Sequence, residues 1–204
     1  MKKKKIGLLG GTFDPIHLGH LNLAVEVLER KKLDGLLLCP AYISPGKLHV
    51  PPTASPQHRW NMVSLAIEGL ASFGAIDQEI NRPSPSYTID TVKRLVNEEV
   101  SLFLILSEEV AYTLPSWKQC GQLLTMVSLI VGATSPLPLS SPSLSPPVME
   151  KIKQGWCPIS VMEISSRNIR NRLAHHLCCD HLIPRKVLDY IYQHRLYCSP
   201  EGEL

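Results

Sequence analysis

The chain has 204 residues, of which 44% are hydrophobic and 19% are charged. At roughly 150 residues per domain, this length favours a single domain, 1–204, and the composition excludes an intrinsically disordered chain. The net charge of +3 comes from four consecutive lysines at 2–5, because the remainder carries 17 basic against 18 acidic residues. A chain with no overall basic field is not expected to bind nucleic acid or a membrane.

No apolar run approaches the roughly 18 residues that span a bilayer. The apolar stretch behind the lysines ends at Gly10-Gly11, which is too short for a signal peptide. The six cysteines contain no Cys-x-x-Cys pair, a usage typical of a reducing compartment. The sequence therefore predicts a cytoplasmic protein, and it leaves the oligomeric state open, a homo-oligomer included.

Short apolar runs alternate with amphipathic stretches along the chain. The apolar runs are nearly continuous, as in strands buried on both faces, and predict strands at 5–9, 35–39, 75–79, 102–106, 127–132 and 159–162. The amphipathic stretches predict helices at about 18–31, from Ser55-Pro56, at 87–97 and 117–125, from Ser165-Ser166 and from Pro184. Strands that alternate with helices predict an α/β fold, a doubly wound parallel sheet followed by C-terminal helices.

Many of the 17 prolines gather at 40–56 and at 136–147. The second group lies in a Pro/Ser-rich stretch, 134–148, which we expect to sustain neither a β-ladder nor a helix. It is predicted to be a mobile surface loop, and loops of this length are often functional or disordered. The sequence does not decide its role, including whether it closes over a substrate.

The segment between the first predicted strand and the first predicted helix reads Gly10-Gly11-Thr12-Phe13-Asp14-Pro15-Ile16-His17-Leu18-Gly19-His20. Glycines let the backbone approach a ligand, and a helix start offers unpaired N–H groups to an anion. His17 and His20 are three residues apart, so both imidazoles are expected to project toward the same anion. The competing interpretation is a Gly-Gly turn followed by two incidental surface histidines.

This segment resembles the signature of the nucleotidyltransferase superfamily, and within it the bacterial nicotinate-nucleotide adenylyltransferases. Three further stretches carry the same resemblance: Glu79-Ile80-x-Arg82 with Pro85-Ser86-Tyr87-Thr88-x-Asp90-Thr91, Leu114-Pro115-Ser116-Trp117, and Ile164-Ser165-Ser166-x-x-Ile169-Arg170-x-Arg172. The resemblance extends from about Ile6 to Tyr197 and implies a Rossmann-like sheet.

The resemblance implies adenylyl transfer from ATP to nicotinate mononucleotide, giving deamido-NAD and pyrophosphate in NAD biosynthesis. It implies that the catalytic residues are His17, His20 and Arg170. It implies an ATP site formed by Gly10, Gly11, Thr12, Phe13, Gly19, Ser107, Glu109, Ser165, Ser166 and Ile169. It implies a mononucleotide site formed by Asp14, Lys47, Arg82, Tyr87, Thr88 and Trp117. No resident metal site is predicted, and Mg²⁺ is expected to be held by the phosphates of the substrate.

Several of these residues also have a physical interpretation of their own. Ser165 and Ser166 resemble an N-cap pair that leaves N–H groups free for an anion, to which Arg170 adds a fixed charge; ordinary helix capping is the alternative. Thr88 follows a Pro-Ser-Pro turn and could begin a helix, with or without a ligand at its start. Trp117 offers a flat face for a pyridine ring, although a lone tryptophan also serves packing.

Three stretches depart from the family's pattern. Ser107-Glu108-Glu109 stands where Gly-x-Asp is usual, and Arg167 stands where threonine is common. Ser44-Pro45-Gly46-Lys47 replaces Pro-Pro-His-Lys, so that Lys47 keeps a cation for phosphate but the imidazole is missing. The sequence does not decide how Ser107 and Glu109 affect the use of ATP.

The stretch His175-His176-Leu177-Cys178-Cys179-Asp180-His181 contains residue types that bind zinc. Adjacent cysteines cannot easily take two corners of a tetrahedron, and histidines at a helix end complement its dipole, so no metal site is predicted there. Two other functions stay open: adenylation of nicotinamide mononucleotide or phosphopantetheine, and a nucleotide-binding module with little activity. A scaffold role for the proline-rich loop is disfavoured, because Pro138 and Pro142 are not spaced Pro-x-x-P.

Overall fold

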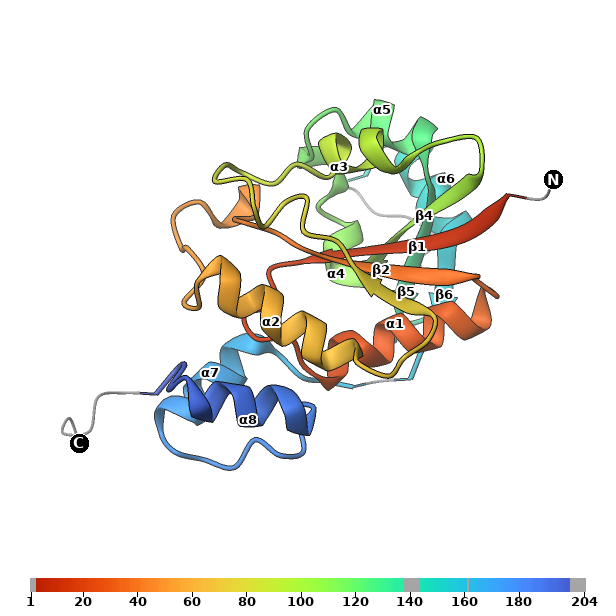
Figure 1. The fold of residues 1–204 in the computed structure, drawn as a ribbon. Helices are drawn as coiled ribbons and strands as arrows, with labels where there is room; N and C mark the ends of the chain where they lie inside the picture. The colour runs from red at the N-terminus through yellow and green to blue at the C-terminus, as the bar shows by residue number, and fades with distance from the viewer. Residues whose placement is uncertain (1–2, 138–143, 161, 199–204) are drawn as a thin grey trace.

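The computed structural model describes residues 3–137, 144–160 and 162–198. Its centre is a six-stranded sheet in the order β3-β2-β1-β4-β5-β6, in which every neighbouring pair is parallel (Figure 1). The strands are β1 Lys4–Gly11, β2 Gly35–Pro40, β3 Phe73–Ala75, β4 Val100–Ser107, β5 Ser128–Ala133 and β6 Trp156–Pro158. This is the strand order of the Rossmann fold.

The central strands are apolar throughout because both of their faces are buried. Leu8 of β1 pairs with Leu104 of β4, and both point into one hydrophobic core. The next pair, Leu9 and Ile105, points into a second core on the opposite face. Successive side chains of a strand alternate between faces, so two cores require a continuous apolar run rather than an alternating one.

Helices cover both faces of the sheet, as Figure 1 shows. Four of them pack on the core that contains Leu9: α1 Leu18–Arg30, α2 Pro56–Ile67, α7 Ser166–Ala174 and α8 Arg185–Gln193. Four pack on the core that contains Leu8: α3 Thr88–Leu95, α4 Glu108–Ala111, α5 Cys120–Met126 and α6 Pro146–Gly155. Two short 3₁₀ turns, η1 Pro45–Lys47 and η2 Leu114–Ser116, complete the described structure.

The doubly wound α/β fold with C-terminal helices is confirmed, but two strand predictions are wrong in position. The third strand is β3, Phe73–Ala75, rather than 75–79. After Ile76 donates to the carbonyl of Leu38, the chain turns, and Ile80 is buried in that turn rather than in the sheet. The sixth strand is β6, Trp156–Pro158, rather than 159–162: it forms the sheet edge, where a terminal proline is tolerated.

The helices also correct the sequence-based boundaries. The stretch 134–148 is not a loop throughout, because Pro146 and Pro147 are the first two residues of α6, where a missing N–H costs nothing. Its residues 138–143 lie outside the described part of the chain. The helix expected at 117–125 begins three residues later, at Cys120, since η2 precedes it. The single-turn helix α4 was not predicted.

The described residues contain no helix that combines the length and the apolar character needed to cross a bilayer. The thiols of all six cysteines are free.

The sheet reverses its winding direction between β1 and β4. The helix after β1, α1, packs on one face, whereas α4, directly after β4, packs on the other. Loops that leave two adjacent strands in opposite directions open a crevice at the carboxyl edge, where ligands bind in doubly wound folds. The fold thus places 12–17 and 107–109 on the two sides of such a crevice.

Candidate active site

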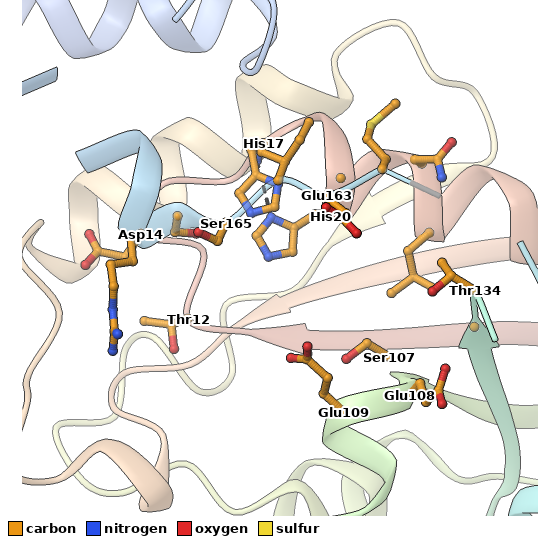
Figure 2. A pocket seen from close by; sticks show the side chains of 18 of the residues that line it. Thr12, Asp14, His17, His20, Ser107, Glu108, Glu109, Thr134, Glu163 and Ser165 are labelled. Atoms are coloured by element: carbon orange, nitrogen blue, oxygen red, sulfur yellow. Dashed lines mark hydrogen bonds between the residues drawn. The ribbon is translucent and has the colours of Figure 1, made fainter. Parts of the chain in front are cut away.

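A cleft of about 1100 Å³ opens at this carboxyl edge (Figure 2). Its walls come from the loop after β1, η1, the ends of β4 and β5, and the first turn of α7. Eleven of the residues expected in the site line it: Thr12, Asp14, His17, Gly19, His20, Lys47, Ser107, Glu109, Ser165, Ser166 and Arg170. Segments that the sequence separates by more than 150 residues are therefore neighbours here.

The two histidines of the loop form a stacked pair. Their ring centroids are 3.7 Å apart with an interplanar angle of 28°, and both rings face Ser107 and Glu109 across the cleft (Figure 2). The backbone N–H of His17 donates to Nδ1 of His20 at 3.3 Å. Because Nδ1 of His20 accepts this bond, the neutral ring carries its proton on Nε2, which is then a donor for a ligand.

Both imidazoles are neutral at pH 7. Burial lowers the pKa of His17, which is only 5% exposed, to about 4. Burial also lowers the pKa of His20 well below 6.5, and the nearby His17 and Lys47 add to the effect. The pair therefore presents N–H donors rather than positive charge, and an anion placed beside it would raise both pKa values.

The glycines of the loop make room for side chains. A Cβ on Gly11 would lie 2.8 Å from the ring of Phe13, and a Cβ on Gly19 would lie 3.1 Å from Nδ1 of His17. Phe13 is buried with a left-handed φ of 49°, and its ring meets that of His20 edge-on. Gly11 and Gly19 thus permit the packing that fixes the histidine pair.

Four residues expected at the ATP site do not line the cleft: Gly10, Gly11, Phe13 and Ile169. Phe13 and Ile169 are core residues that fix the loop and α7 from behind. The nearest atom to a Cβ built on Gly10 is the carbonyl oxygen of Cys39 at 3.9 Å, an ordinary contact distance, so packing does not require glycine there.

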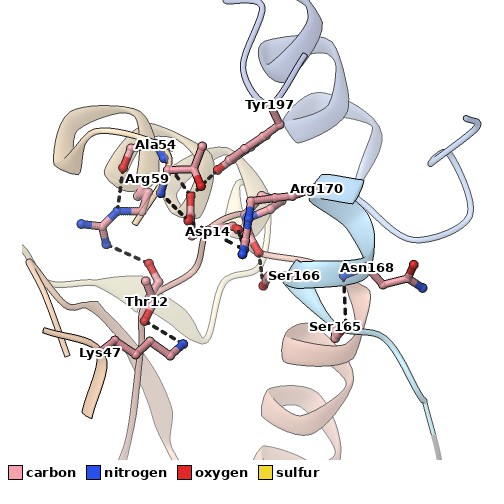
Figure 3. A network of polar contacts seen from close by, with 12 residues as sticks. Thr12, Asp14, Lys47, Ala54, Arg59, Ser165, Ser166, Asn168, Arg170 and Tyr197 are labelled. Atoms are coloured by element: carbon pink, nitrogen blue, oxygen red, sulfur yellow. Dashed lines mark hydrogen bonds and ion pairs between the residues drawn. The ribbon is translucent and has the colours of Figure 1, made fainter. Parts of the chain in front are cut away.

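Asp14, expected to contact substrate, has its carboxylate occupied by the protein itself (Figure 3). It is 5% exposed, and its Oδ1 accepts hydrogen bonds from the backbone N–H of Ala54 at 3.0 Å and the hydroxyl of Tyr197 at 2.8 Å. Its Oδ2 accepts from the N–H of Thr53 at 2.8 Å. Asp14 ties the loop after β1 to two other segments.

The first turn of α7 is attached to the same loop. Ser165 caps the helix by accepting from the N–H of Asn168, so the expected N-cap is confirmed. The hydroxyl of Ser166 donates to the carbonyl of Pro15 at 2.9 Å. Arg170 donates to the backbone carbonyl of Asp14 at 2.7 Å and lies 3.8 Å from its Oδ2. These contacts hold the serines and a guanidinium at the wall of the cleft.

Arg59 of α2 donates to the loop after β1, and no sequence pattern predicted this role. Its side chain is 0% exposed, and burial lowers the pKa of its guanidinium, an effect that Asp14 opposes. The guanidinium donates to four backbone carbonyls, those of Thr12, Ala41, Tyr42 and Ala54. No pattern marks such a residue, because its partners are main-chain atoms of other segments.

The other residues expected at the mononucleotide site gather around the start of α3, and Arg82, Tyr87, Thr88 and Trp117 do not line the cleft. Thr88 is the first residue of α3, and the ammonium of Lys118 lies 4.4 Å from the centre of the Tyr87 ring. Their part in binding stays a prediction.

The backbone of Tyr42 joins the start of α3 to the loop after β1. Its N–H donates to the hydroxyl of Ser86, directly before Tyr87, and its carbonyl accepts from Arg59. The start of α3 is therefore linked, through one peptide and one guanidinium, to the loop that carries the histidine pair.

The described residues contain no group of three or more His, Cys, Asp or Glu side chains placed to hold a metal. In the stretch 175–181, Cys179 is buried, whereas the exposed thiol of Cys178 donates to Asp180 at 3.4 Å.

The cytidylyltransferase-like family model matches residues 8–172. A probable nicotinate-nucleotide adenylyltransferase from Oceanobacillus iheyensis is 36% identical over 196 residues, which cover 95% of this chain and 97% of the relative. The chain therefore belongs to the cytidylyltransferase-like family, and within it to the nicotinate-nucleotide adenylyltransferases. A relative of the same name from Listeria monocytogenes is also 36% identical, over 96% of this chain and 98% of its own length.

Solved structures share the fold at lower identity. A putative nicotinate-nucleotide adenylyltransferase from Vibrio parahaemolyticus superposes with a TM-score of 0.67 at 16% identity, covering 97% of each chain. Nicotinic acid mononucleotide adenylyltransferase from Plasmodium falciparum, in complex with NaAD, also gives 0.67, at 17% identity over 95% of this chain and 97% of that one. The Rossmann-like sheet of the family is thus confirmed.

The depressed pKa of His17 predicts a pH-dependent stability. Between pH 6.5 and about 4 the unfolded chain binds a proton at this residue and the folded chain does not, so the free energy of unfolding falls as the pH is lowered. The full effect is about 3 kcal/mol at 1.36 kcal/mol per pKa unit. In urea unfolding at several pH values, His17→Gln should flatten this slope; an unchanged slope would contradict the assignment.

Arg59→Leu should lower the free energy of unfolding by about 3–5 kcal/mol, because it leaves buried carbonyls without a donor and removes one of the two guanidinium groups near Asp14. The control is Arg30→Ala, since Arg30 is exposed and forms an ion pair with Glu26 of its own helix. Urea unfolding of both variants should show a large loss for Arg59 alone; equal losses would contradict the role given to the buried guanidinium.

Proposed function

We propose that this protein transfers the adenylyl group of ATP to nicotinate mononucleotide, releasing pyrophosphate and forming deamido-NAD in NAD biosynthesis. The observation that carries the proposal is the convergence of a stacked imidazole pair and the first turn of α7 on one cleft at the switch point of the sheet. The family membership of the chain supports the choice of reaction.

This reaction needs no general base. The attacking group is the phosphate of the mononucleotide, which is already an anion at neutral pH because its second pKa is near 6. The difficulty is to bring two anionic phosphates into line and to stabilise the charge that they crowd together. Donors fixed in advance by the protein supply that stabilisation at little cost of rearrangement, and the histidine pair is fixed in this way.

We assign the reacting phosphate of ATP to His20 and His17. The Nε2–H of His20 donates to an oxygen of the α-phosphate. The backbone N–H of His17 donates to Nδ1 of His20 and so fixes the orientation of that ring. Both rings take up positive character as the phosphate charge approaches, since an adjacent anion raises the pKa of an imidazole.

The departing pyrophosphate is assigned to the start of α7. Ser165, Ser166 and Arg170 bring a capped helix start and a guanidinium to one wall of the cleft, and both attract anions. Lys47, on the opposite side of the loop, donates to the hydroxyl of Thr12 at 3.4 Å and adds a second cation. Ser107 and Glu109, at the end of β4, are assigned to the nucleoside part of ATP.

The pyridine end of the mononucleotide is assigned to the start of α3. Its carboxylate is an anion, and the first turn of α3 offers N–H groups to it. Arg82 adds a cation, and Tyr87 and Trp117 offer aromatic faces for the ring. The hydrogen bonds of Tyr42 fix the position of this region relative to the histidine loop.

The carboxylates of the cleft fit a metal ion that is bound mainly by the triphosphate. Asp14 is occupied by protein donors, and Glu108 accepts from Ser135 at 2.6 Å, whereas Glu109 and Glu163 face the cleft. Mg²⁺ favours such a site, since it keeps several waters and binds substrate phosphates with one or two carboxylates. When bound, it would neutralise part of the charge on the phosphates.

His20→Ala should lower kcat by about 10²- to 10³-fold, because it removes a donor to the charge that develops on the α-phosphate. His181→Ala, a change of an exposed histidine between α7 and α8, should leave kcat unchanged. Steady-state pyrophosphate release from Mg·ATP and nicotinate mononucleotide measures both. A normal kcat in a folded His20→Ala protein would remove His20 from the mechanism.

The acceptor itself is tested by measuring pyrophosphate release with nicotinate mononucleotide, nicotinamide mononucleotide and phosphopantetheine side by side. The value of kcat/KM should be highest for nicotinate mononucleotide. A higher value for either of the others would reassign the substrate. Binding of ATP by calorimetry, without pyrophosphate release for any acceptor, would identify a nucleotide-binding module instead.

A further inference from the structure

The described chain ends in a segment that returns to the loop after β1. After α8, the residue Tyr197 adopts a left-handed φ of 63°, and its half-buried ring packs against the core beneath α1 and α2. This conformation brings the hydroxyl to Oδ1 of Asp14 at 2.8 Å, across 183 residues of sequence. Figure 3 shows Tyr197 and Arg170 approaching Asp14 from the same side. A non-glycine residue keeps such a backbone only where its surroundings fix it.

The hydroxyl of Tyr197 is a permanent donor. Burial and the charge of Asp14 raise its pKa far above the ordinary value of a phenol, so the proton stays on Tyr197. With the N–H groups of Thr53 and Ala54, it gives Asp14 three neutral donors, and together they fix the rotation of the carboxylate. A carboxylate held by three hydrogen bonds keeps its oxygens in fixed positions, and these oxygens can then fix the position of a cation beside them.

That cation is Arg170. Its Nη1 donates to the carbonyl of Asp14 at 2.7 Å and lies 3.8 Å from the Oδ2 of the same residue, while the side chain borders the cleft. The position of the guanidinium thus depends on both the backbone and the carboxylate of Asp14. His17 follows three residues later in the same loop, so a shift of Asp14 would move both phosphate-binding groups.

We propose that Tyr197 is a positioning residue for the phosphate site: through Asp14 it holds Arg170, and with it the loop that carries His17, in the geometry required for adenylyl transfer. The proposal rests on the function proposed above. It makes the segment after α8 part of the active site, although that segment follows the last helix and contains no motif of the site.

Tyr190 provides a matched control, because it too joins α8 to the body of the protein through its hydroxyl. That hydroxyl lies 2.9 Å from Nδ1 of His58 and 2.8 Å from Nδ2 of Asn61, both on α2. None of these three residues lines the cleft. A purely structural attachment of the C-terminal segment would therefore be weakened by either Tyr→Phe change.

The experiment compares Tyr197→Phe with Tyr190→Phe by melting temperature and by kcat and KM for ATP and nicotinate mononucleotide. Tyr197→Phe should lower kcat by about tenfold, since small displacements of positioning groups have effects of this order. KM for nicotinate mononucleotide should change by less than about twofold. Tyr190→Phe should lower the melting temperature with kcat unchanged. Equal kcat losses, or none for Tyr197→Phe, would overturn the proposal.

A double-mutant cycle tests the route through Asp14 and Arg170. In an Arg170→Lys background, Tyr197→Phe should cost less than about twofold in kcat, because the group that it positions is already displaced. A tenfold loss of kcat from Tyr197→Phe in the Arg170→Lys background would overturn the proposal. Asp14→Asn provides a second route should Tyr197→Phe fold poorly: it should lower kcat similarly, and an unchanged kcat would overturn the proposal. Absence of pyrophosphate release by the unmodified protein would instead overturn the proposed function.

Discussion

The active cleft depends on one buried carboxylate. Asp14 lies almost entirely out of water, where an unpaired charge would cost several kcal/mol, and the fold meets that cost with two backbone N–H groups, a phenol and nearby guanidinium groups. These donors come from the segment before α2, from α7 and from the chain after α8. Satisfying Asp14 therefore requires these segments to meet the loop after β1, and their meeting forms the end of the cleft to which we assign the phosphates.

The cleft combines fixed cations with neutral donors. Arg170 and Lys47 carry charge at the wall, whereas His17 and His20 are kept neutral by burial. Two stacked imidazolium rings would repel each other, and the neutral pair avoids this while its N–H groups stay in place. A triphosphate bound beside the pair would raise both pKa values, so the positive character of the pair would increase with substrate present. This arrangement suits a reaction whose charge is concentrated at the transferred phosphate.

The two ends of the proposed reaction are supported by different parts of the fold. The histidine loop and α7 belong to the side of the sheet covered by α1 and α2, while α3 belongs to the opposite side. Two sets of hydrogen bonds connect them: Arg59 donates to the main-chain carbonyls of Thr12 and Tyr42, and the N–H of Tyr42 donates to the hydroxyl of Ser86. The carbonyls that accept from Arg59 are present whatever the side chains at those positions, whereas the bond from Tyr42 needs the hydroxyl of Ser86.

The sequence by itself determined the doubly wound fold, the His17–His20 pair at a strand-to-helix junction and the capped start of α7, because each depends on local periodicity or spacing. It could not set the ends of β3 and β6, which follow from hydrogen bonds to distant strands. Only the tertiary structure decided that Gly11 makes room for Phe13, that Asp14 is occupied by the protein, and that Arg59 and Tyr197 complete the site. Asp14, Arg59 and Tyr197 bind partners in distant segments of the chain, and no local pattern encodes a contact of that kind.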